Sequence, residues 1–174
     1  MDLLEIIKGR RAVRRFQEKP ISMEDLRKII EAAIWAPSGS NLQAWEFILI
    51  TKKKNIEKIK MISPGLFGNP QALIVVCINK ERAKKGGRLG EEMALMDISI
   101  ASQNMMLMAY SLGIGSCPVA SFNKVALNEL LSIPKHVDPK LILIFGYPLK
   151  WPKPPRRRPL EEVLHLEEFG KHLE

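Results

Sequence analysis

The chain has 174 residues, 46% of them apolar, which is enough for one domain with a substantial core. Its net charge of +8 favours an acidic small molecule, a polyanion or an anionic surface as partner, or else the lysine-rich surface that heat-tolerant proteins carry. The two cysteines have no CxxC spacing, so neither a disulfide framework nor a zinc site is indicated.

The N-terminal stretch predicts a short helix followed by a cluster of arginines. Asp2 can cap a helix that ends near Gly9, and the range Arg10–Arg15 then holds four arginines. A guanidinium group is permanently charged and presents a planar fork of donors that matches phosphate oxygens. Basic residues are also favourable in the last turn of a helix. The cluster is therefore either a solvated helix end or a phosphate-binding site, and the residues themselves leave both interpretations open.

A second helix leads into a polar loop. Ser22 provides an N-cap, apolar residues recur at helical spacing after it, and Pro37 ends the helix near Ala36. The loop that follows, Pro37–Gln43, combines hydroxyl and amide side chains with a glycine, so its backbone and its side chains can both contact a ligand. An ordinary turn between a helix and a strand is the alternative interpretation of this loop.

The middle of the chain alternates short elements and ends in one long helix. Buried strands are predicted at Trp45–Ile50 and Ala72–Ile78, with a helix between them at Asn55–Met61. Glu81–Arg88 is polar and contains two glycines, which predicts an exposed, mobile segment. The helix predicted at Leu89–Leu112 is apolar almost all round, and one domain of this size can hardly surround it. A subunit interface along this helix is therefore expected.

The C-terminal part predicts three more elements and then an extended arm. The elements are a tight strand or loop, a helix and a buried strand, at Ile114–Val119, Asn123–Leu131 and Leu141–Pro148. Prolines stiffen Trp151–Pro155, a second arginine cluster follows at Arg156–Arg158, and Val163–Leu166 has the character of a strand. A stiff arm that ends in an apolar strand is poorly suited to folding back on its own domain, so we expect it to reach across to a partner subunit.

The side chains present do not predict catalysis by a protein nucleophile or by a metal. His136, His165 and His172 lie late in the chain with no nearby nucleophile or ligand spacing, and packing or surface positions explain them better. The Gly86–Gly90 stretch lacks the Gly-Lys-Ser/Thr ending of a phosphate-binding P-loop. The first residues lack the pattern of a signal peptide and no uncharged run could span a bilayer, which predicts a cytoplasmic protein without a membrane partner.

Several motifs, spread over nearly the whole chain, occur together in one family. They are Arg10-Arg11-Ala12-Val13-Arg14-Arg15-Phe16, the Ala-Pro-Ser-x-x-Asn-x-Gln-x-Trp pattern of Ala36–Trp45, Asp97 with Gln103-Asn104, Leu112–Cys117, Gly146-Tyr147-Pro148 and Arg157–Val163. In these motifs, and in the spacing of the first two, the chain resembles the nitroreductase family of FMN-dependent oxidoreductases.

The resemblance implies a fold and an assembly. The fold is α+β, a nitroreductase-like arrangement of three layers with a mixed, mostly antiparallel sheet flanked by helices. The assembly is an intertwined homodimer with two FMN molecules at the subunit interface. Residues 1–174 would form a single domain, in which residues 151–174 are a C-terminal extension that reaches the partner subunit.

The resemblance also implies an FMN site. Arg10, Arg11 and Arg14 correspond to the first flavin-binding motif, with Arg14 near the pyrimidine edge of the ring and Arg10 facing the phosphate. Arg157, with Arg156 beside it, would complete the phosphate site. A loop of the other subunit and the backbone of one strand would supply the remaining contacts, namely Pro37, Ser38, Ser40, Asn41 and Gln43, and Cys117, Pro118 and Val119. No protein side chain is expected to be the catalytic group, because the flavin carries the chemistry.

The implied reaction is reduction of the flavin by NAD(P)H, which leaves before a nitroaromatic, quinone or similar acceptor is reduced in turn.

The chain departs from the family in places: Ala12 and Ala44 replace a common serine and proline, and the stretch from Cys117 to Leu141 is too short for the helical insertion of larger members. A specialised flavin protein, such as a dehalogenase or a flavin-storing or flavin-cleaving member, is one alternative. A basic nucleic-acid-binding protein is another, but no recognition motif accompanies the arginines, and no nucleic acid partner is expected.

Overall fold

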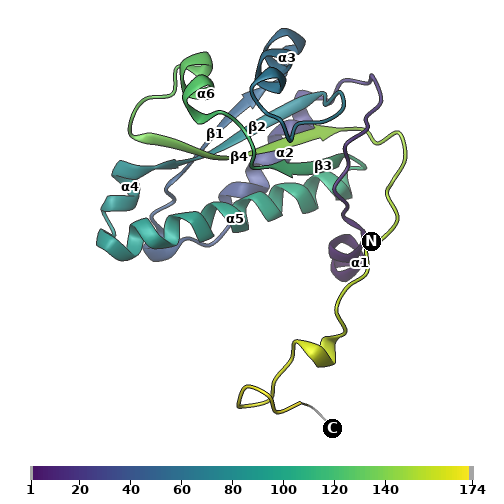
Figure 1. Ribbon diagram of the computed structural model, residues 1–174, viewed down its shortest axis with the longest axis vertical. Coiled ribbons are helices and arrows are strands. Elements are labelled where there is room, and N and C mark those ends of the chain that lie inside the picture. The colour runs from purple at the N-terminus through teal and green to yellow at the C-terminus, as the bar shows by residue number, and fades with distance from the viewer. Residues whose placement is uncertain (1, 173–174) are drawn as a thin grey trace.

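One antiparallel sheet forms the centre of the molecule, and Figure 1 shows it in the computed structural model, which describes residues 2–172. The strands are β1 (Trp45–Ile50), β2 (Ala72–Asn79), β3 (Gly115–Val119) and β4 (Val137–Gly146), and they lie in the order β1-β2-β4-β3. The sequence from Ala72 to Ile78 is buried throughout, as expected of the strand between β1 and β4. A parallel pairing occurs at the isolated bridge between Ala12 and Ser116.

Helices cover both faces of the sheet. On one face lie α2 (Met23–Ile34) and α5 (Gly87–Ser111), and on the other lie α3 (Lys53–Met61) and α6 (Lys124–Leu131). Successive residues of a strand point to opposite faces. Ile74 and Val76 of β2 therefore pack with the first pair of helices, while Leu73 and Val75 pack with the second. The α+β fold of three layers is thus confirmed.

The long helix α5 is only partly enclosed by its own chain. Ala101 and Met105 are fully buried against the sheet, while Leu95 and Met96 are 54% and 51% exposed. The short helix α1 (Leu3–Gly9) contributes no buried residue. This agrees with the expectation that one domain does not surround the long helix. None of the helices among residues 2–172 combines the length and the apolar character needed to cross a lipid bilayer.

Two elements, a short helix and the start of a strand, differ from the prediction. The stretch expected to be mobile contains a helix, α4 (Lys80–Lys84), and the Asn79 side chain caps it by accepting a hydrogen bond from the Arg82 backbone N at 3.1 Å. A five-residue helix has too little periodicity to be recognised in a polar sequence. β4 begins earlier than predicted, because Val137 and Asp138 pair with the end of β2 although they precede the apolar run.

After β4 the chain forms an arm that leaves the body. Figure 1 shows the arm passing α1 and continuing away from the sheet. The strand predicted at Val163–Leu166 is wrong, because a short 3-10 helix (η2, Leu160–Glu162) is followed there by a turn. A strand needs a hydrogen-bonding neighbour, and within residues 2–172 no other strand lies beside this segment. Its apolar side chains are instead exposed, and Phe169 is exposed by 93%.

Candidate functional site

The arginine motif is attached to the edge of the sheet at β3. Val13 donates its backbone N–H to the carbonyl oxygen of Ser116 at 2.9 Å, and its side chain is 1% exposed. This approach requires Gly115, because a Cβ there would lie 2.8 Å from the Cβ of Val13. Since Val13 faces the core, the neighbouring Arg14 is left exposed at the surface beside β3.

The C-terminal arm is attached to the same region. Leu149 donates its backbone N–H to the carbonyl oxygen of Arg15 at 3.1 Å, so the two ends of the chain run side by side. Farther along, the ring of Trp151 meets the ring of Tyr110 edge-on, with centroids 5.0 Å apart and planes at 77°. Gly9 makes room for this pair, because a Cβ at Gly9 would lie 2.1 Å from the Tyr110 hydroxyl oxygen. The start of the arm is therefore held against α1 and α5.

These attachments bring Arg10 and Arg157 together from opposite ends of the chain. Both line a cavity of about 620 Å³, together with Arg11 and Gln103. Burial lowers the pKa of Arg10, and the positive charges of Arg157 and Arg11 lower this pKa further. The Nε of Arg10 is buried and has no hydrogen-bond partner. A cavity that gathers cationic groups and holds an unpaired donor is suited to an anion.

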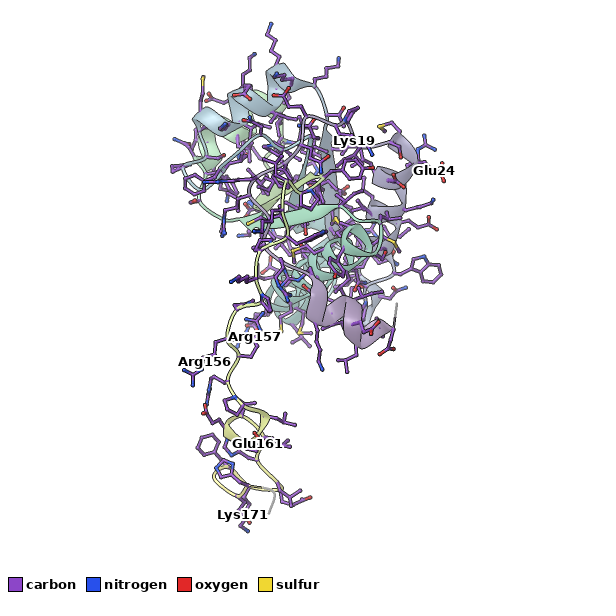
Figure 2. The ribbon with its side chains drawn as sticks, turned by 90° about the vertical axis from the view of Figure 1, so that its right-hand side faces the viewer. Lys19, Glu24, Arg156, Arg157, Glu161 and Lys171 are labelled. Atoms are coloured by element: carbon purple, nitrogen blue, oxygen red, sulfur yellow. The ribbon has the colours of Figure 1, made fainter. Side chains whose placement is uncertain are left out.

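The other arginines of the two clusters have different surroundings. Arg11 turns its guanidinium back onto the end of α1, where it donates to the carbonyl oxygen of Arg10 at 2.8 Å and to that of Lys8. Arg11 is therefore a basic residue at a helix end, as one of the two interpretations predicts, and it also lines the cavity. Arg14 lies close enough to Cys117 that, with Arg10, it partly offsets the burial that raises the pKa of this thiol. Arg156 is exposed on the arm, and Figure 2 shows it next to Arg157 below the body.

The backbone of β3 is the third part of the predicted site. Cys117 and Val119 are 1% and 3% exposed, so their side chains are packed in the core. Pro118 between them is exposed. A flat ligand beside this strand would meet Pro118 and the main chain, and the thiol would stay inside.

The polar loop lies on α5, away from the arginines. It contains a short 3-10 helix (η1, Gly39–Asn41). Ser40, Asn41 and Gln43 have φ angles of 49°, 54° and 50°, a left-handed conformation that costs about 1–2 kcal/mol per residue for most side chains. The hydroxyl of Ser38 accepts a hydrogen bond from the Gln43 backbone N at 3.1 Å and closes the loop. Strained backbone of this kind concentrates at functional sites.

Within one chain the loop and the arginine cluster are separate. Arg10 and Arg157 line two cavities together, and among the described residues none of Pro37–Gln43 lines either of them. Both regions contact α5, the loop at Asp97 and the cluster at Gln103. Asp97 and Gln103 are six positions apart in α5, which corresponds to about 9 Å along the helix axis. A single chain therefore presents the arginine cluster and the polar loop at two separate places along one helix.

The comparisons with known proteins decide the family. The model described as "Nitroreductase family" matches residues 7–64 and 60–147, which together are well over half of the chain. The chain belongs to the nitroreductase family. It is 34% identical over 158 residues to a protein of Methanothermobacter thermautotrophicus whose name gives NADH dehydrogenase and NAD(P)H nitroreductase as alternatives, covering 87% of this chain and 80% of that protein.

Two further relatives agree with this assignment to the nitroreductase family. An FMN reductase (NAD(P)H) of Bacillus subtilis is 29% identical over 185 residues, which cover 97% of this chain and 74% of that protein. A crystal structure of a nitroreductase family protein from Clostridium difficile superposes with a TM-score of 0.86 at 31% identity, covering 97% of this chain and 99% of that one. The resemblance recognised in the sequence motifs is therefore confirmed.

Sequence reasoning missed the residues that position the nitroreductase motifs. Tyr110 and Trp151 carry no chemistry, and only their contact at the base of the arm shows their use. The family motif that contains Asp97 and Gln103 predicts no role for either residue, yet Asp97 anchors the polar loop and Gln103 lines the arginine cavity. The available signal was that both polar residues interrupt an otherwise apolar helix.

Proposed function

We propose that this chain holds FMN with its two arginine clusters and transfers reducing equivalents from NAD(P)H to a nitroaromatic, quinone or similar acceptor. Membership of the nitroreductase family makes it an FMN-dependent NAD(P)H oxidoreductase. The acceptor class and the residues that bind the flavin are the proposal. The observation that carries it is the convergence of Arg10 and Arg157 on one cavity.

The residues present fit the phosphate of FMN. This group is a dianion, and the positive charges of Arg10 and Arg157 repel each other in the absence of an anion. The Nε of Arg10 has no hydrogen-bond partner. An anion bound between the two guanidinium groups would relieve their mutual repulsion. Each charge-assisted hydrogen bond that it accepts from them contributes about 1.5–3 kcal/mol. Arg11 lines the same cavity, and exposed Arg156 can join at its edge. When bound, FMN itself supplies the redox chemistry.

The other candidate residues orient the flavin and set its environment. Arg14, exposed beside β3, is placed to stabilise negative charge at the pyrimidine edge of the ring. Pro118 and the backbone of Cys117 and Val119 offer a surface along the ring. This division of roles requires no side chain to act as nucleophile or general base.

The polar loop would complete the site of a partner subunit. Ser38, Ser40, Asn41 and Gln43 carry its hydroxyl and amide groups, and Pro37 adds an apolar ring. None of these residues lines either of the two cavities that Arg10 and Arg157 share within residues 2–172 of one chain. A homodimer that covers the exposed face of α5 would bring this loop to the other copy's arginine cluster. The same dimer would bury against the partner the exposed apolar side chains of the arm, which extends over residues 151–174; residues 173 and 174 lie outside the described residues.

A binding experiment tests the proposal. FMN is titrated into the flavin-free protein and into Arg10→Ala, Arg157→Ala and Arg15→Ala, with flavin fluorescence as the readout. The first two variants should raise the Kd by at least about tenfold, since each removes a charge-assisted contact. Arg15→Ala removes the same charge from an exposed side chain of the same motif, and it should bind like the wild type. A wild-type protein that takes up no FMN would overturn the proposal.

An activity screen then separates the alternatives. NADH and NADPH are supplied with nitroaromatic, quinone and halogenated acceptors. Nucleotide oxidation that depends on a nitroaromatic or quinone supports the proposal. A protein that binds FMN but oxidises neither nucleotide with any acceptor is a flavin-storing member, and turnover confined to halogenated compounds identifies a dehalogenase.

A further inference from the structure

A corner formed by α4 and the first turns of α5 holds the polar loop from the outside. We call residues Lys80–Asp97 the α4–α5 corner. Its sequence predicts only an exposed, mobile segment at Glu81–Arg88, and the Gly86–Gly90 stretch lacks the ending of a P-loop. Three independent contacts join this corner to the loop Ser38–Gln43, and each acts on a different part of the loop.

The first contact is the side chain of Arg82 in α4. Its Nε donates to the carbonyl oxygens of Leu42 and Gln43, each at 3.2 Å, and its Nη2 donates to the Leu42 carbonyl oxygen at 3.1 Å. Gln43 is one of the left-handed residues. The planar fork of donors therefore fixes two consecutive carbonyl groups at the end of the loop.

The second contact is a notch that receives the side chain of Leu42. A Cβ on Gly86 would lie 2.6 Å from the Leu42 Cδ1, and a Cβ on Gly90 would lie 3.0 Å from the same atom. A side chain at either position would have to displace Leu42. Gly86 and Gly90 thus have a packing role, because the absence of side chains at these two positions makes room for Leu42. This explains why glycines occur in a stretch that is not a P-loop.

The third contact is Asp97, which holds the beginning of the loop. Asp97 is 3% exposed, and its two carboxyl oxygens accept hydrogen bonds from the backbone N of Gly39 at 3.2 and 3.3 Å. Within residues 2–172 no lysine or arginine forms an ion pair with Asp97. A buried acid without a basic partner is uncommon, because its burial is unfavourable unless its hydrogen bonds compensate.

The loop needs such support because of its backbone. Left-handed φ angles at Ser40, Asn41 and Gln43 are intrinsically unfavourable, and a free segment of this sequence would spend most of its time in other conformations. Hydrogen bonds inside the loop, from Gln43 to Ser38 and to Asn41, do not tie it to the rest of the molecule. The contacts with the corner do.

We propose that Asp97 and Arg82 are positioning residues, which with the Gly86 and Gly90 notch hold the polar loop in its flavin-binding conformation before the ligand arrives. This inference rests on the proposed function, in which the loop contacts FMN. A loop that is already ordered loses less conformational freedom on binding. If the competent conformation is populated only part of the time, the apparent affinity falls by that fraction.

Two pairs of variants test the inference. Asp97→Leu removes the acceptor at nearly constant volume, whereas Asp97→Asn keeps one acceptor oxygen. Arg82→Met removes the two carbonyl contacts from an exposed position. Arg88→Met is its matched control, because Arg88 is also exposed and within residues 2–172 it pairs with Glu92 alone, one turn along α5. Flavin-free proteins are compared by hydrogen exchange at Gly39–Gln43, and FMN binding is then measured by fluorescence.

The expected result is a graded loss of order confined to the loop. Asp97→Leu and Arg82→Met should both accelerate hydrogen exchange in the loop. They should raise the Kd for FMN by about tenfold and about threefold, respectively, which corresponds to a binding-competent loop conformation that is populated about one tenth or one third of the time. Asp97→Asn and Arg88→Met should stay close to the wild type in both measurements. Reduction potentials of bound FMN should be unchanged in all four, because Arg14 is not affected.

The outcomes separate this inference from the proposed function. Unchanged exchange and affinity in Arg82→Met would overturn the role of the corner even if Asp97→Leu failed to fold. Faster exchange in the loop with an unchanged Kd would show that the corner orders the loop without serving FMN, and this also overturns the inference. A wild type that binds no FMN would refute the proposed function, whereas the exchange measurement would still report on the anchoring.

Discussion

Replacing Trp151 with alanine is expected to weaken the binding of FMN while leaving the binding of riboflavin unchanged. Trp151 is not among the residues that line the two cavities shared by Arg10 and Arg157, and its ring instead meets that of Tyr110 at a centroid distance of 5.0 Å. From this contact the proline-stiffened chain continues directly to Arg157, which lines the cavity with Arg10. The substitution therefore acts on the phosphate end of the site through the position of the arm.

The size of the effect follows from the contact that is lost. An edge-to-face aromatic pair is worth about 0.5–1.5 kcal/mol beyond the area that it buries. Removing it lowers the docked population of the arm, and a loss of that size corresponds to a roughly two- to tenfold rise in the Kd for FMN. The effect should be smaller than that of Arg157→Ala, which deletes a contact of about 1.5–3 kcal/mol outright.

The assay compares two ligands that differ only in the phosphate. FMN and riboflavin are titrated into the wild type, Trp151→Ala, Trp151→Phe and Tyr110→Phe, with flavin fluorescence as the readout. The two phenylalanine variants keep an aromatic pair and should bind FMN nearly as the wild type does. Equal weakening of FMN and riboflavin by Trp151→Ala would refute the reasoning, because it would mean that the whole site, and not the phosphate contact, depends on the arm.

Three further predictions concern single side chains. Arg14→Ala should lower the reduction potential of bound FMN, because a fixed positive charge near the pyrimidine edge is removed, and an unchanged potential in a spectroelectrochemical titration would exclude this role. Burial raises the pKa of Cys77 to about 12, so the native thiol should not react with iodoacetamide at pH 8 and should react once the protein is unfolded; rapid native labelling would contradict the buried position. Burial opposes the ionisation of Asp138, but hydrogen bonds from Lys124 and Lys140 more than offset it and hold its pKa below the usual range. This carboxyl therefore contributes stability that is present above about pH 4 and is lost as the pH falls through its lowered pKa, and the advantage of the wild type over Asp138→Asn in urea unfolding should shrink over that interval.

Local patterns in the sequence were enough to predict most of the architecture. The apolar run at Ala72–Ile78 and the helical spacing after Ser22 predict elements that the structure contains at those places. The cap of α4 at Asn79 is just as local, but the helix is only five residues long, and its polar sequence resembles a loop. Val163–Leu166 shows the opposite error, because strand-forming residues take up a strand only when a neighbouring strand pairs with them.

The candidate site divides in the same way. The sequence by itself determined which chemistry is present, two arginine clusters and a polar loop, because residue type and spacing are local properties. Only the tertiary structure decided that Arg10 and Arg157 meet, and that Asp97 holds the amide of Gly39. These meetings depend on close approaches such as Val13 on Gly115 and Trp151 on Tyr110, in which residues far apart in the chain must fit each other's shape. Such fit is settled by packing across the whole domain, and no interaction between sequence neighbours encodes it.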